Sequence, residues 1–362
     1  MPTKDDLRYF QSMPLEIKLG LTRNRIREWV NHYGVNGTYV SFSGGKDSTV
    51  LLHIVREMYP EIEAVFVNTG LEYPEIQKFV KTFDNVTILR PKMRFDEVIK
   101  TNGYPIISKE VSNTIRGARE SIRKGVYSHR LCKLGVEPDE YGGLTDSGEH
   151  DYKAALAKSK FRKSKYKPLL DTDFLISERC CDVMKKAPFK EFEKRTGKKP
   201  MIATMAQESM SRETAWLKNG CNAFDSKRPS SKPMSFWTNQ DVLQYIKQHS
   251  IPIATVYGDV EYETDPEQMR LEDYGVSVDG CEQLITTGCD RTGCIFCAFG
   301  CQAETGISRF QRLKETHPRQ YEYCIGGGEY VEGVWQPNKQ GLGMGHIFDE
   351  LNKIYGDGFI KY

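Results

Sequence analysis

The chain has 362 residues, of which 39% are hydrophobic and 28% charged, and its formal net charge is +2. This composition can fill a hydrophobic core, and the near-neutral charge by itself indicates no class of partner. No run approaches the roughly 18 consecutive apolar residues of a membrane span, and the N-terminal stretch lacks the apolar core of a signal peptide. We therefore expect a cytoplasmic protein with no membrane partner, whose ten cysteines are mostly reduced and serve metal or redox chemistry rather than disulfides.

The first third of the sequence alternates between strand-like and helix-like patterns. Apolar side chains at near-helical spacing predict a helical lead-in over residues 1–37. Strands are then expected over 38–42, 63–67 and 86–89, with helices over 49–58 and 73–83 between them. Further along, 201–205 is strand-like, and Thr238-Asn-Gln-Asp241 is typical of a capping box that opens a helix. The order predicts an α/β fold built on a doubly wound parallel sheet.

A basic segment interrupts this alternation. Residues 109–167 contain 14 Lys or Arg against 8 Asp or Glu, and we interpret them as an insertion in an α/β domain over 38–260. Cysteine and glycine dominate from residue 280 onward. Residues 261–362 are therefore expected to form a Cys-rich C-terminal region.

Within the insertion, the run from Lys158 to Lys167 combines basic residues with the aromatics Phe161 and Tyr166. Basic side chains with interleaved aromatics suit a nucleic-acid backbone with stacked bases. A solvated loop or helix face has the same composition. Nucleic acid is one expected partner of this run, and a plain charged surface is the alternative.

The hexapeptide SGGKDS, residues 43–48, follows an expected strand and precedes an expected helix. It is not a Walker A loop, because the Gly-x-x-x-x-Gly-Lys-Ser/Thr pattern fails at Val40 and at Asp47. Its two glycines let the backbone approach an anion, and the amides and dipole of a helix start favour negative charge. The serine hydroxyls and Lys46 add donors and charge, whereas Asp47 is expected to orient a metal ion or the loop itself. The hexapeptide therefore predicts a phosphate-binding loop.

This loop resembles the PP-loop of the ATP pyrophosphatase, or adenine nucleotide α-hydrolase, superfamily. Four further stretches resemble motifs of its phosphoadenosine phosphosulfate (PAPS) reductase-like branch, in the family's order. They are Asn68-Thr-Gly-Leu-Glu-Tyr-Pro-Glu75, Cys180-Cys-Asp-Val-Met-Lys-Lys186, Met205-Ala-Gln-Glu-Ser-Met-Ser-Arg212 and Lys232-Pro-Met-Ser-Phe-Trp-Thr-Asn-Gln-Asp-Val242. The third stretch lacks the glycine and the first arginine of the family pattern. The resemblance covers the chain from about residue 38 to about residue 320.

The resemblance implies a PP-loop nucleotide-binding domain over 38–260, with ATP or a related adenine nucleotide as ligand and Mg²⁺ to neutralise its pyrophosphate. The implied catalytic residues are Lys46, Asp47 and Arg212. The implied nucleotide-binding residues are Ser43, Gly44, Gly45, Ser48, Asn68, Thr69, Gly70, Glu208 and Ser209. For Arg212 the alternative role is a surface salt bridge.

A second signal is GCDRTGCIFCAFGC, residues 288–301, whose cysteines have the spacing C-x4-C-x2-C-x3-C. Four thiolates without a nearby histidine suit an iron–sulfur cluster or an all-thiolate zinc site. Adjacent cysteines diverge too strongly to share one metal atom, but each can bind a different iron of a cubane cluster. In adenylyl-sulfate reductases of the family, a vicinal pair and a later C-x-x-C hold a 4Fe–4S cluster, which implies as ligands Cys180, Cys181, Cys294 and Cys297. The alternatives are inert buried thiols, or a local cluster or zinc set made of Cys289, Cys294, Cys297 and Cys301.

The remaining cysteines are isolated. We expect Cys132, Cys221 and Cys281 to be small buried hydrophobes. Cys324 matters more, because thioredoxin-dependent reductases of the family carry their nucleophile in a C-terminal Glu-Cys-Gly-Ile/Leu-His motif, which this chain lacks. The sulfur-attacking nucleophile is therefore absent, replaced by Cys324 in a different setting, or supplied by a partner.

These features leave three readings of the function. The first is an enzyme of sulfur metabolism or sulfur transfer that acts at the α-phosphate of ATP or a sulfonucleotide, with a sulfur donor or reductant protein as partner. The second is a genuine reductase of adenylyl sulfate or PAPS that produces sulfite. The third is a non-catalytic module that binds nucleotide or nucleic acid.

Overall fold

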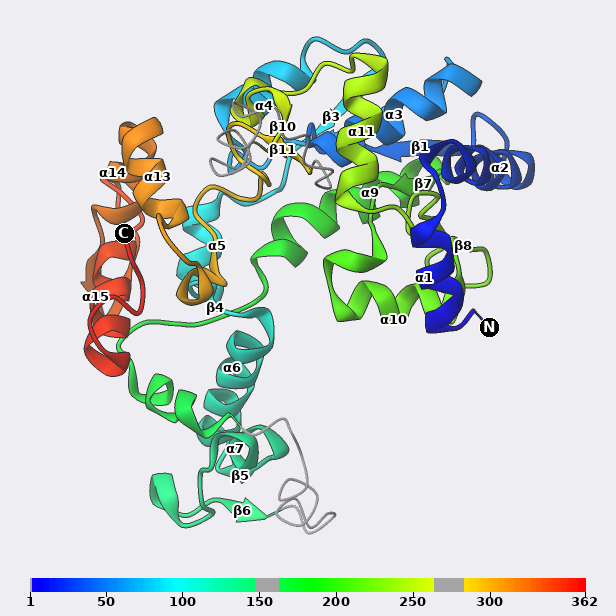
Figure 1. Ribbon diagram of the computed structural model, residues 1–362. Helices are drawn as coiled ribbons and strands as arrows, with labels where there is room; N and C mark the ends of the chain where they lie inside the picture. The colour runs from blue at the N-terminus through cyan, green and yellow to red at the C-terminus, as the bar shows by residue number, and fades with distance from the viewer. Residues whose placement is uncertain (1, 147–162, 264–282) are drawn as a thin grey trace, which may run out of the picture. The chain divides into compact units, whose positions relative to one another are not determined.

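The computed structural model describes residues 2–146, 163–263 and 283–362 (Figure 1). Its chain divides into two compact units, each assembled from separate segments. The first unit comprises Met1–Asn68, Glu72–Arg90 and Pro188–Cys294, and the second comprises Thr69–Leu71, Pro91–Ala187 and Ile295–Tyr362. The three-part division expected from the sequence stays a prediction.

A six-stranded sheet organises the first unit, in the order β3-β2-β1-β7-β9-β8. Its strands are parallel apart from β8, which runs antiparallel to β9. Their bounds are β1 Thr38–Ser41, β2 Ala64–Val67, β3 Val86–Leu89, β7 Lys199–Ile202, β8 Asn222–Ala223 and β9 Ser230–Ser231. In register, Val40 of β1 faces Ala64 of β2 on one side and Met201 of β7 on the other.

Helices cover both faces of this sheet. Val40 and Phe66 belong to the large core that includes residues of α2, α3 and α11, whereas Tyr39 and Val65 pack with Phe192 of α9. Because successive side chains of a strand point to opposite faces, this division shows that both faces are buried. The helices are α1 Lys4–Ser12, α2 Leu15–Tyr33, α3 Lys46–Met58, α4 Pro74–Val80, α9 Ala187–Thr196, α10 Met210–Asn219 and α11 Asn239–His249. A hairpin of β10 (Val260–Tyr262) and β11 (Leu284–Thr286) completes the unit.

The order of the strands predicts where a ligand of this sheet would bind. From β1 the chain moves outward through β2 and β3 in one direction, and it later adds β7 and β9 on the other side of β1. The topological switch point therefore lies between β1 and β7. In open parallel sheets, ligands bind outside the carboxyl ends of the strands at such a point. The loops that follow β1 and β7 are the hexapeptide 43–48 and the segment that contains Glu208.

The second unit is built from helices and short strand pairs. Parallel pairs join β4 (Ile106–Ile107) to β12 (Ala298–Phe299) and β5 (Val126–Tyr127) to β6 (Thr145–Asp146), and β13 (Glu329–Val331) forms a hairpin with β14 (Val334–Gln336). Its α-helices are α5 Phe95–Asn102, α6 Lys109–Arg123, α7 His129–Leu134, α13 Arg309–Thr316, α14 Pro318–Ile325 and α15 Met344–Tyr355. A π-helix spans Asp182–Lys186, between Cys181 and α9.

The predicted α/β class with a mainly parallel sheet is confirmed. The expected strand 86–89 coincides with β3, and the capping box at Thr238 and Asp241 does open α11. Helix α3 begins at Lys46 rather than at residue 49, because Gly45 serves as its N-cap. The second half of the hexapeptide is therefore the first turn of a helix. No helix in the described ranges is long and apolar enough to cross a membrane.

Candidate functional site

The loop after β1 depends on one glycine with a left-handed backbone. Gly44 has φ +71°, a region that L side chains rarely adopt. A Cβ atom at this position would lie 2.7 Å from a methyl group of Val80 and 2.8 Å from one of Ile76, both on α4. Conformation and close packing together therefore require glycine here, and they turn the chain sharply from β1 into α3.

Serine hydroxyls brace the loop from inside. The Ser43 amide donates to Ser48 Oγ at 3.1 Å, and the Gly45 amide donates to Ser43 Oγ at 3.3 Å. Ser48 Oγ donates to the Gly45 carbonyl at 2.9 Å. Gly45 provides no side-chain cap to α3, and the dipole at such a helix start favours negative charge. This geometry is compatible with the predicted phosphate-binding loop.

Lys46 is held by residues from the last sequence segment of the first unit, residues 188–294. Its side chain is buried and its Nζ donates to the Asp290 carbonyl at 2.6 Å. Its amide donates to the Tyr257 hydroxyl at 3.3 Å, and that hydroxyl lies 2.5 Å from Thr292 Oγ1. Burial lowers the pKa of the Lys46 ammonium. The segment around residue 290 therefore lies directly beside the phosphate loop.

Asp47 points a carboxylate oxygen into the interior without a partner. Among the described residues its Oδ1 is buried and has no hydrogen bond. Burial raises the pKa of this carboxyl group, while the charges of Lys46, Arg291 and Arg212 act in the opposite direction. An orphaned carboxylate beside a phosphate cradle fits Mg²⁺, which is usually held by one or two carboxylates together with phosphate oxygens and water.

Glu208 gathers two arginines after β7. It ends the short helix Ala206–Glu208, and its carboxylate pairs with Arg212 of α10 and, at 2.6 Å, with Arg291 Nη2. The Glu208 side chain is only 10% exposed, whereas those of Arg212 and Arg291 are 41% and 59% exposed. The salt bridge considered for Arg212 is thus present, and it holds the guanidinium within electrostatic reach of Asp47. Ser209 serves as the N-cap of α10.

The other predicted nucleotide-binding residues follow β2. The Asn68 amide donates to the Leu89 carbonyl at 2.9 Å, which continues the pairing of β2 with β3. Thr69 Oγ1 accepts the Leu71 amide at 3.1 Å, and Gly70 has φ +74°. Asn68 belongs to the first unit, while Thr69 and Gly70 belong to the second.

Two of the four predicted metal ligands, Cys180 and Cys181, interact through a hydrogen bond between their thiols. A hydrogen bond from Cys180, together with the nearby cations Lys109 and Lys185, lowers the pKa of Cys181 to about 5. Burial raises the pKa of Cys297, and the negative charge on Cys181 contributes to that increase. Three thiols of the second unit therefore interact. A π-helix follows the pair directly, a feature frequent at functional sites.

The thiols fit a soft metal by chemistry but not by arrangement. Within residues 2–146, 163–263 and 283–362, no three His, Cys, Asp or Glu side chains are placed to hold a metal ion. Cys294, the fourth predicted ligand, closes the last segment of the first unit. Of the alternative local set, Cys301 is buried, and burial raises the pKa of its thiol to about 12.

Cys324 has the wrong surroundings for a nucleophile. Its side chain is fully buried on α14, and its thiol lies 3.5 Å from Met344 Sδ. Burial raises the pKa of this thiol well above its usual range. A nucleophilic cysteine needs an accessible thiolate, so this setting counts against Cys324 as the sulfur-attacking group.

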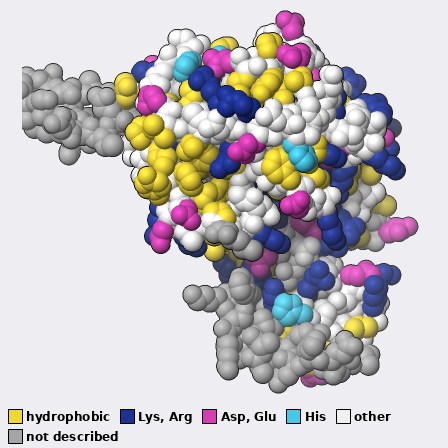
Figure 2. All heavy atoms as spheres, turned by 90° about the vertical axis from the view of Figure 1, so that its right-hand side faces the viewer, with side chains coloured by type: hydrophobic (Ala, Val, Ile, Leu, Met, Phe, Trp, Pro, Cys, Tyr) yellow, Lys and Arg dark blue, Asp and Glu magenta, His cyan; other side chains and the backbone are white. Residues whose placement is uncertain are grey.

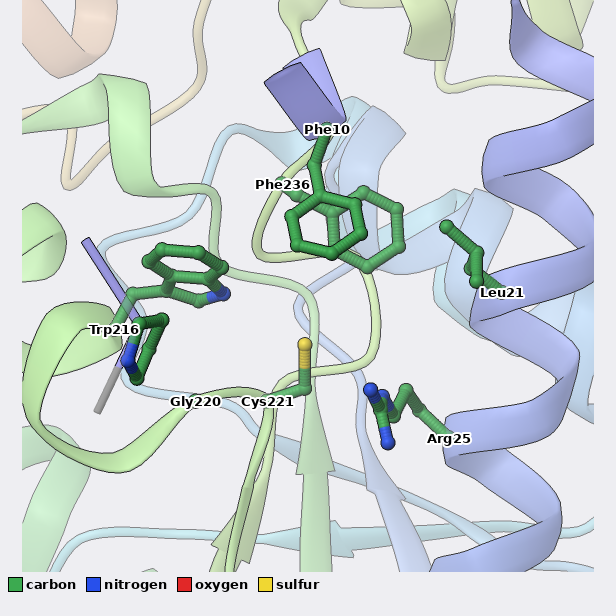
Figure 3. A pocket seen from close by; sticks show the side chains of 8 residues that line it. Phe10, Leu21, Arg25, Trp216, Gly220, Cys221 and Phe236 are labelled. Atoms are coloured by element: carbon green, nitrogen blue, oxygen red, sulfur yellow. The ribbon is translucent and has the colours of Figure 1, made fainter. Parts of the chain in front are cut away.

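A separate apolar cavity of about 260 Å³ lies in the first unit (Figure 3). The rings of Phe10, Trp216 and Phe236 line it, and Cys221 and Arg25 lie at its base. Burial raises the pKa of the Cys221 thiol, but the residue is only partly buried and its sulfur lies 3.3 Å from Ser235 Oγ, so it is not the fully buried hydrophobe that we expected. None of the predicted site residues lines this cavity.

The predicted aromatic contribution to nucleic-acid binding is wrong for Tyr166, because its ring is buried and cannot stack on a base. Residues 158–162 of the same run, and Cys281, lie outside the described residues.

Sequence reasoning missed Tyr257, Asp290, Arg291 and Thr292. The last three lie within the motif Cys289-Asp-Arg-Thr-Gly-Cys294. We interpreted this motif only as a metal site, because of the spacing of its cysteines. The strong polarity between these cysteines was the available signal. No pattern in the sequence connects Tyr257 with the phosphate loop.

A family model described as the phosphoadenosine phosphosulfate reductase domain matches residues 37–120 and 141–299. The match covers more than half of the chain, which therefore belongs to the PAPS reductase domain family. An uncharacterized protein of Methanocaldococcus jannaschii is 35% identical over 79 residues, which are 20% of this chain and 18% of that relative. The crystal structure of PAPS reductase from Candida auris in complex with phosphate aligns at 12% identity with a TM-score of 0.36, over 77% of this chain and 96% of that one.

Proposed function

We propose that the chain binds an adenine nucleotide, ATP or a sulfonucleotide, in the loop 43–48 and acts at its α-phosphate. The observation that carries this proposal is the left-handed turn at Gly44, which leads into an uncapped helix start at the switch point of the sheet. Membership of the PAPS reductase domain family supports an adenine nucleotide as the ligand.

The predicted site residues of the first unit then have the following roles. The amides at the start of α3 and the hydroxyls of Ser43 and Ser48 would bind the phosphoryl tail, with Gly44 and Gly45 giving the backbone close approach. Lys46 and Arg212 would stabilise the negative charge that develops on the leaving pyrophosphate. Asp47 would hold Mg²⁺, which supplies further neutralisation of that charge.

The remaining assignments rest on the family motifs. We include Asn68, Thr69 and Gly70, and the Glu208–Ser209 corner, among the nucleotide-binding residues. Glu208 orients Arg212 and Arg291, so its contribution is indirect. Arg291 is an addition to the motif, supported by its ion pair with Glu208 and its electrostatic effect on Lys46 and Asp47.

A 4Fe–4S cluster or zinc on Cys180, Cys181, Cys294 and Cys297 is supported by the family motif and by the acidic thiol of Cys181. Because no three ligands converge among the described residues, we assign no step to such a group. Reduction of a sulfonucleotide to sulfite would need a thiol other than the buried Cys324, or a reductant protein. Such reduced thiols suit a cytoplasmic setting.

A paired assay tests the proposal. Anaerobically purified protein is incubated with Mg²⁺ and either ATP, or PAPS with reduced thioredoxin as the electron donor, and pyrophosphate, ADP and sulfite are measured. In the wild type we expect release of pyrophosphate from ATP or of a nucleotide product from PAPS. In Asp47→Asn we expect this product to be lost. Release of ADP and phosphate alone would contradict action at the α-phosphate. Binding without any turnover would favour the non-catalytic reading. Sulfite formation that survives in Cys324→Ser would identify a reductase with a different thiol.

A further inference from the structure

Residues 286–292 form a segment of the first unit that is fastened to the short helix ending at Tyr257. The Gly288 amide donates to the Tyr257 carbonyl at 2.8 Å. One residue further on, the Cys289 amide donates to the Val256 carbonyl at 3.0 Å. A Cβ atom at Gly288 would lie 2.5 Å from the Val256 carbonyl oxygen, so glycine permits this close approach of the two backbones. Backbone contacts therefore hold the segment 286–292 and Tyr257 together.

Two hydroxyl groups of this assembly lie over the start of α3. A Cβ atom at Gly45, the N-cap of α3, would lie 3.2 Å from Tyr257 Oη and 3.6 Å from Thr292 Oγ1. The Lys46 amide donates to Tyr257 Oη at 3.3 Å, and the two hydroxyl oxygens are 2.5 Å apart. The hydroxyl pair therefore lies at the helix start where the predicted phosphate loop would receive an anion.

This pair has one proton more than its hydrogen bonds use. Only one of the two hydroxyl protons can lie in the bond between Tyr257 and Thr292, and the described residues provide no acceptor for the other. A phenol, with a pKa of about 10, is a better donor than an aliphatic alcohol. Tyr257 also accepts the Lys46 amide, which leaves its own proton for Thr292. Thr292 therefore keeps its proton for a further acceptor.

The two hydroxyl-bearing residues differ in their access to a ligand. Tyr257 is only 2% exposed, whereas Thr292 is partly exposed. The hydrogen bonds thus run outward from the Lys46 amide through Tyr257 to Thr292, and bonds in such a chain polarise one another and strengthen the last donor. The same segment orients the Lys46 ammonium, whose Nζ donates to the Asp290 carbonyl at 2.6 Å.

We propose that Thr292 donates its hydroxyl proton to a phosphoryl oxygen of the bound nucleotide, and that Tyr257 positions Thr292 for this contact. The inference rests on the proposed function, because it takes the loop 43–48 as the phosphate site. A hydrogen bond to a charged phosphate oxygen is roughly twice as strong as one between neutral groups. The contact therefore raises affinity for the phosphates and not for the nucleoside. The polar residues between Cys289 and Cys294 gain a role in nucleotide binding, whatever the cysteines bind.

Calorimetry tests this contact, with ATP and adenosine each titrated into Mg²⁺-containing protein. Thr292→Val keeps the shape of the side chain but removes the hydroxyl, and it should weaken ATP binding about tenfold without changing adenosine binding. Thr292→Ser keeps the hydroxyl and should bind ATP within about twofold of the wild type. The face drawn in Figure 2 carries Lys and Arg side chains interspersed with hydrophobic and acidic ones. Because neither substitution changes the charge, a loss of affinity would not reflect a general attraction of ATP to such cations.

The positioning role of Tyr257 has its own readout. Tyr257→Phe should weaken ATP binding about threefold, and this effect should vanish when Thr292 is already valine, because the two residues act through one contact. A purely structural role of Tyr257 would instead give additive losses in the double variant. The control is Tyr245→Phe, which also removes a buried tyrosine hydroxyl, here bonded to His53 Nδ1 at 2.9 Å, and should leave ATP affinity unchanged. Thermal unfolding of each variant checks that the fold is intact.

The outcomes separate this inference from the proposed function. If wild-type protein bound ATP no better than adenosine, the phosphate site itself would be contradicted, and the role of Thr292 with it. If the wild type preferred ATP and Thr292→Val did so equally, the role of Thr292 would be overturned while the phosphate loop would stand. Equal losses in Thr292→Val and Thr292→Ser would also overturn it, because they would reflect packing rather than the hydroxyl. Additive losses in the double variant would overturn the positioning role of Tyr257.

Discussion

The phosphate loop and the thiols of this protein are built in opposite ways. The loop is one run of six residues, and its shape follows from a left-handed glycine, two bracing serines and an uncapped helix. The thiols come from segments more than a hundred residues apart, and among the described residues they do not converge on one point. A backbone-built site is thus complete once the local chain has folded, whereas a side-chain site depends on how distant segments pack or on what they bind.

Among the substitutions considered, replacement of Gly44 should have the largest effect on stability and on nucleotide binding, because it alters the backbone of the loop. Gly44→Ala would need a left-handed alanine and would force its methyl group against Val80 and Ile76. We expect the free energy of unfolding to fall by about 2–4 kcal/mol and nucleotide binding to be lost. Chemical denaturation and calorimetry measure the two quantities.

The control for this variant is Gly20→Ala, in the middle of α2, where a new Cβ atom meets nothing within 4 Å. It should stabilise the protein by up to about 1 kcal/mol and leave nucleotide binding unchanged. If Gly44→Ala bound nucleotide as the wild type does, the loop would not be the anion cradle.

The second prediction concerns the orphaned carboxylate. Asp47→Asn should reduce Mg²⁺-dependent turnover by roughly a hundredfold and leave nucleotide affinity without metal nearly unchanged. Because burial raises the pKa of Asp47 in the folded state, ionisation of this group costs stability. That cost is absent at low pH and grows as pH rises through the folded pKa, so Asp47→Asn should be at least as stable as the wild type at neutral pH. Denaturant titration across pH would show this, and a clear destabilisation at pH 7 would contradict it.

Much of the fold and of the loop could be predicted from the sequence, because both depend on local signals. The apolar runs of β1 to β3 and the capping box at Thr238 act within a few residues of themselves. The contacts of Lys46 with Tyr257 and with the segment around residue 290 could not be predicted, because they join residues more than two hundred positions apart. The burial of Cys324 and Tyr166 likewise depends on tertiary packing that a single sequence does not reveal.

A third prediction contrasts two thiols. In metal-free protein at pH 7, Cys181 should be almost entirely thiolate, since its pKa is about 5. Iodoacetamide should therefore modify it at a rate that stays nearly constant from about pH 6 to pH 8, where an ordinary cysteine slows about tenfold per pH unit, and that falls only as pH drops below the pKa of Cys181. Cys324 should stay unmodified until the protein unfolds, because its thiol is buried and protonated. Mass spectrometry of the labelled peptides shows which cysteine is modified at each time. Early labelling of Cys324 would contradict this prediction and would support Cys324 as the nucleophile.

The smallest expected effect belongs to the arginine that the motifs did not mark. Arg291→Gln removes one exposed partner of Glu208 and should weaken ATP binding by about fivefold, mainly at low salt. Arg319→Gln, on the exposed side of α14, is a control of equal charge and should have no effect. An unchanged affinity in Arg291→Gln would restrict the site to the loop and Arg212.

One calorimetric comparison separates binding of the phosphates from binding of the nucleoside. ATP and adenosine are titrated into the same Mg²⁺-containing protein, since the two ligands share the nucleoside and differ only in the phosphates. If the amides and hydroxyls at residues 43–48 hold those phosphates, ATP should bind at least a hundredfold more tightly than adenosine. Equal affinities for the two ligands, or no heat from either with correctly folded protein, would contradict the account.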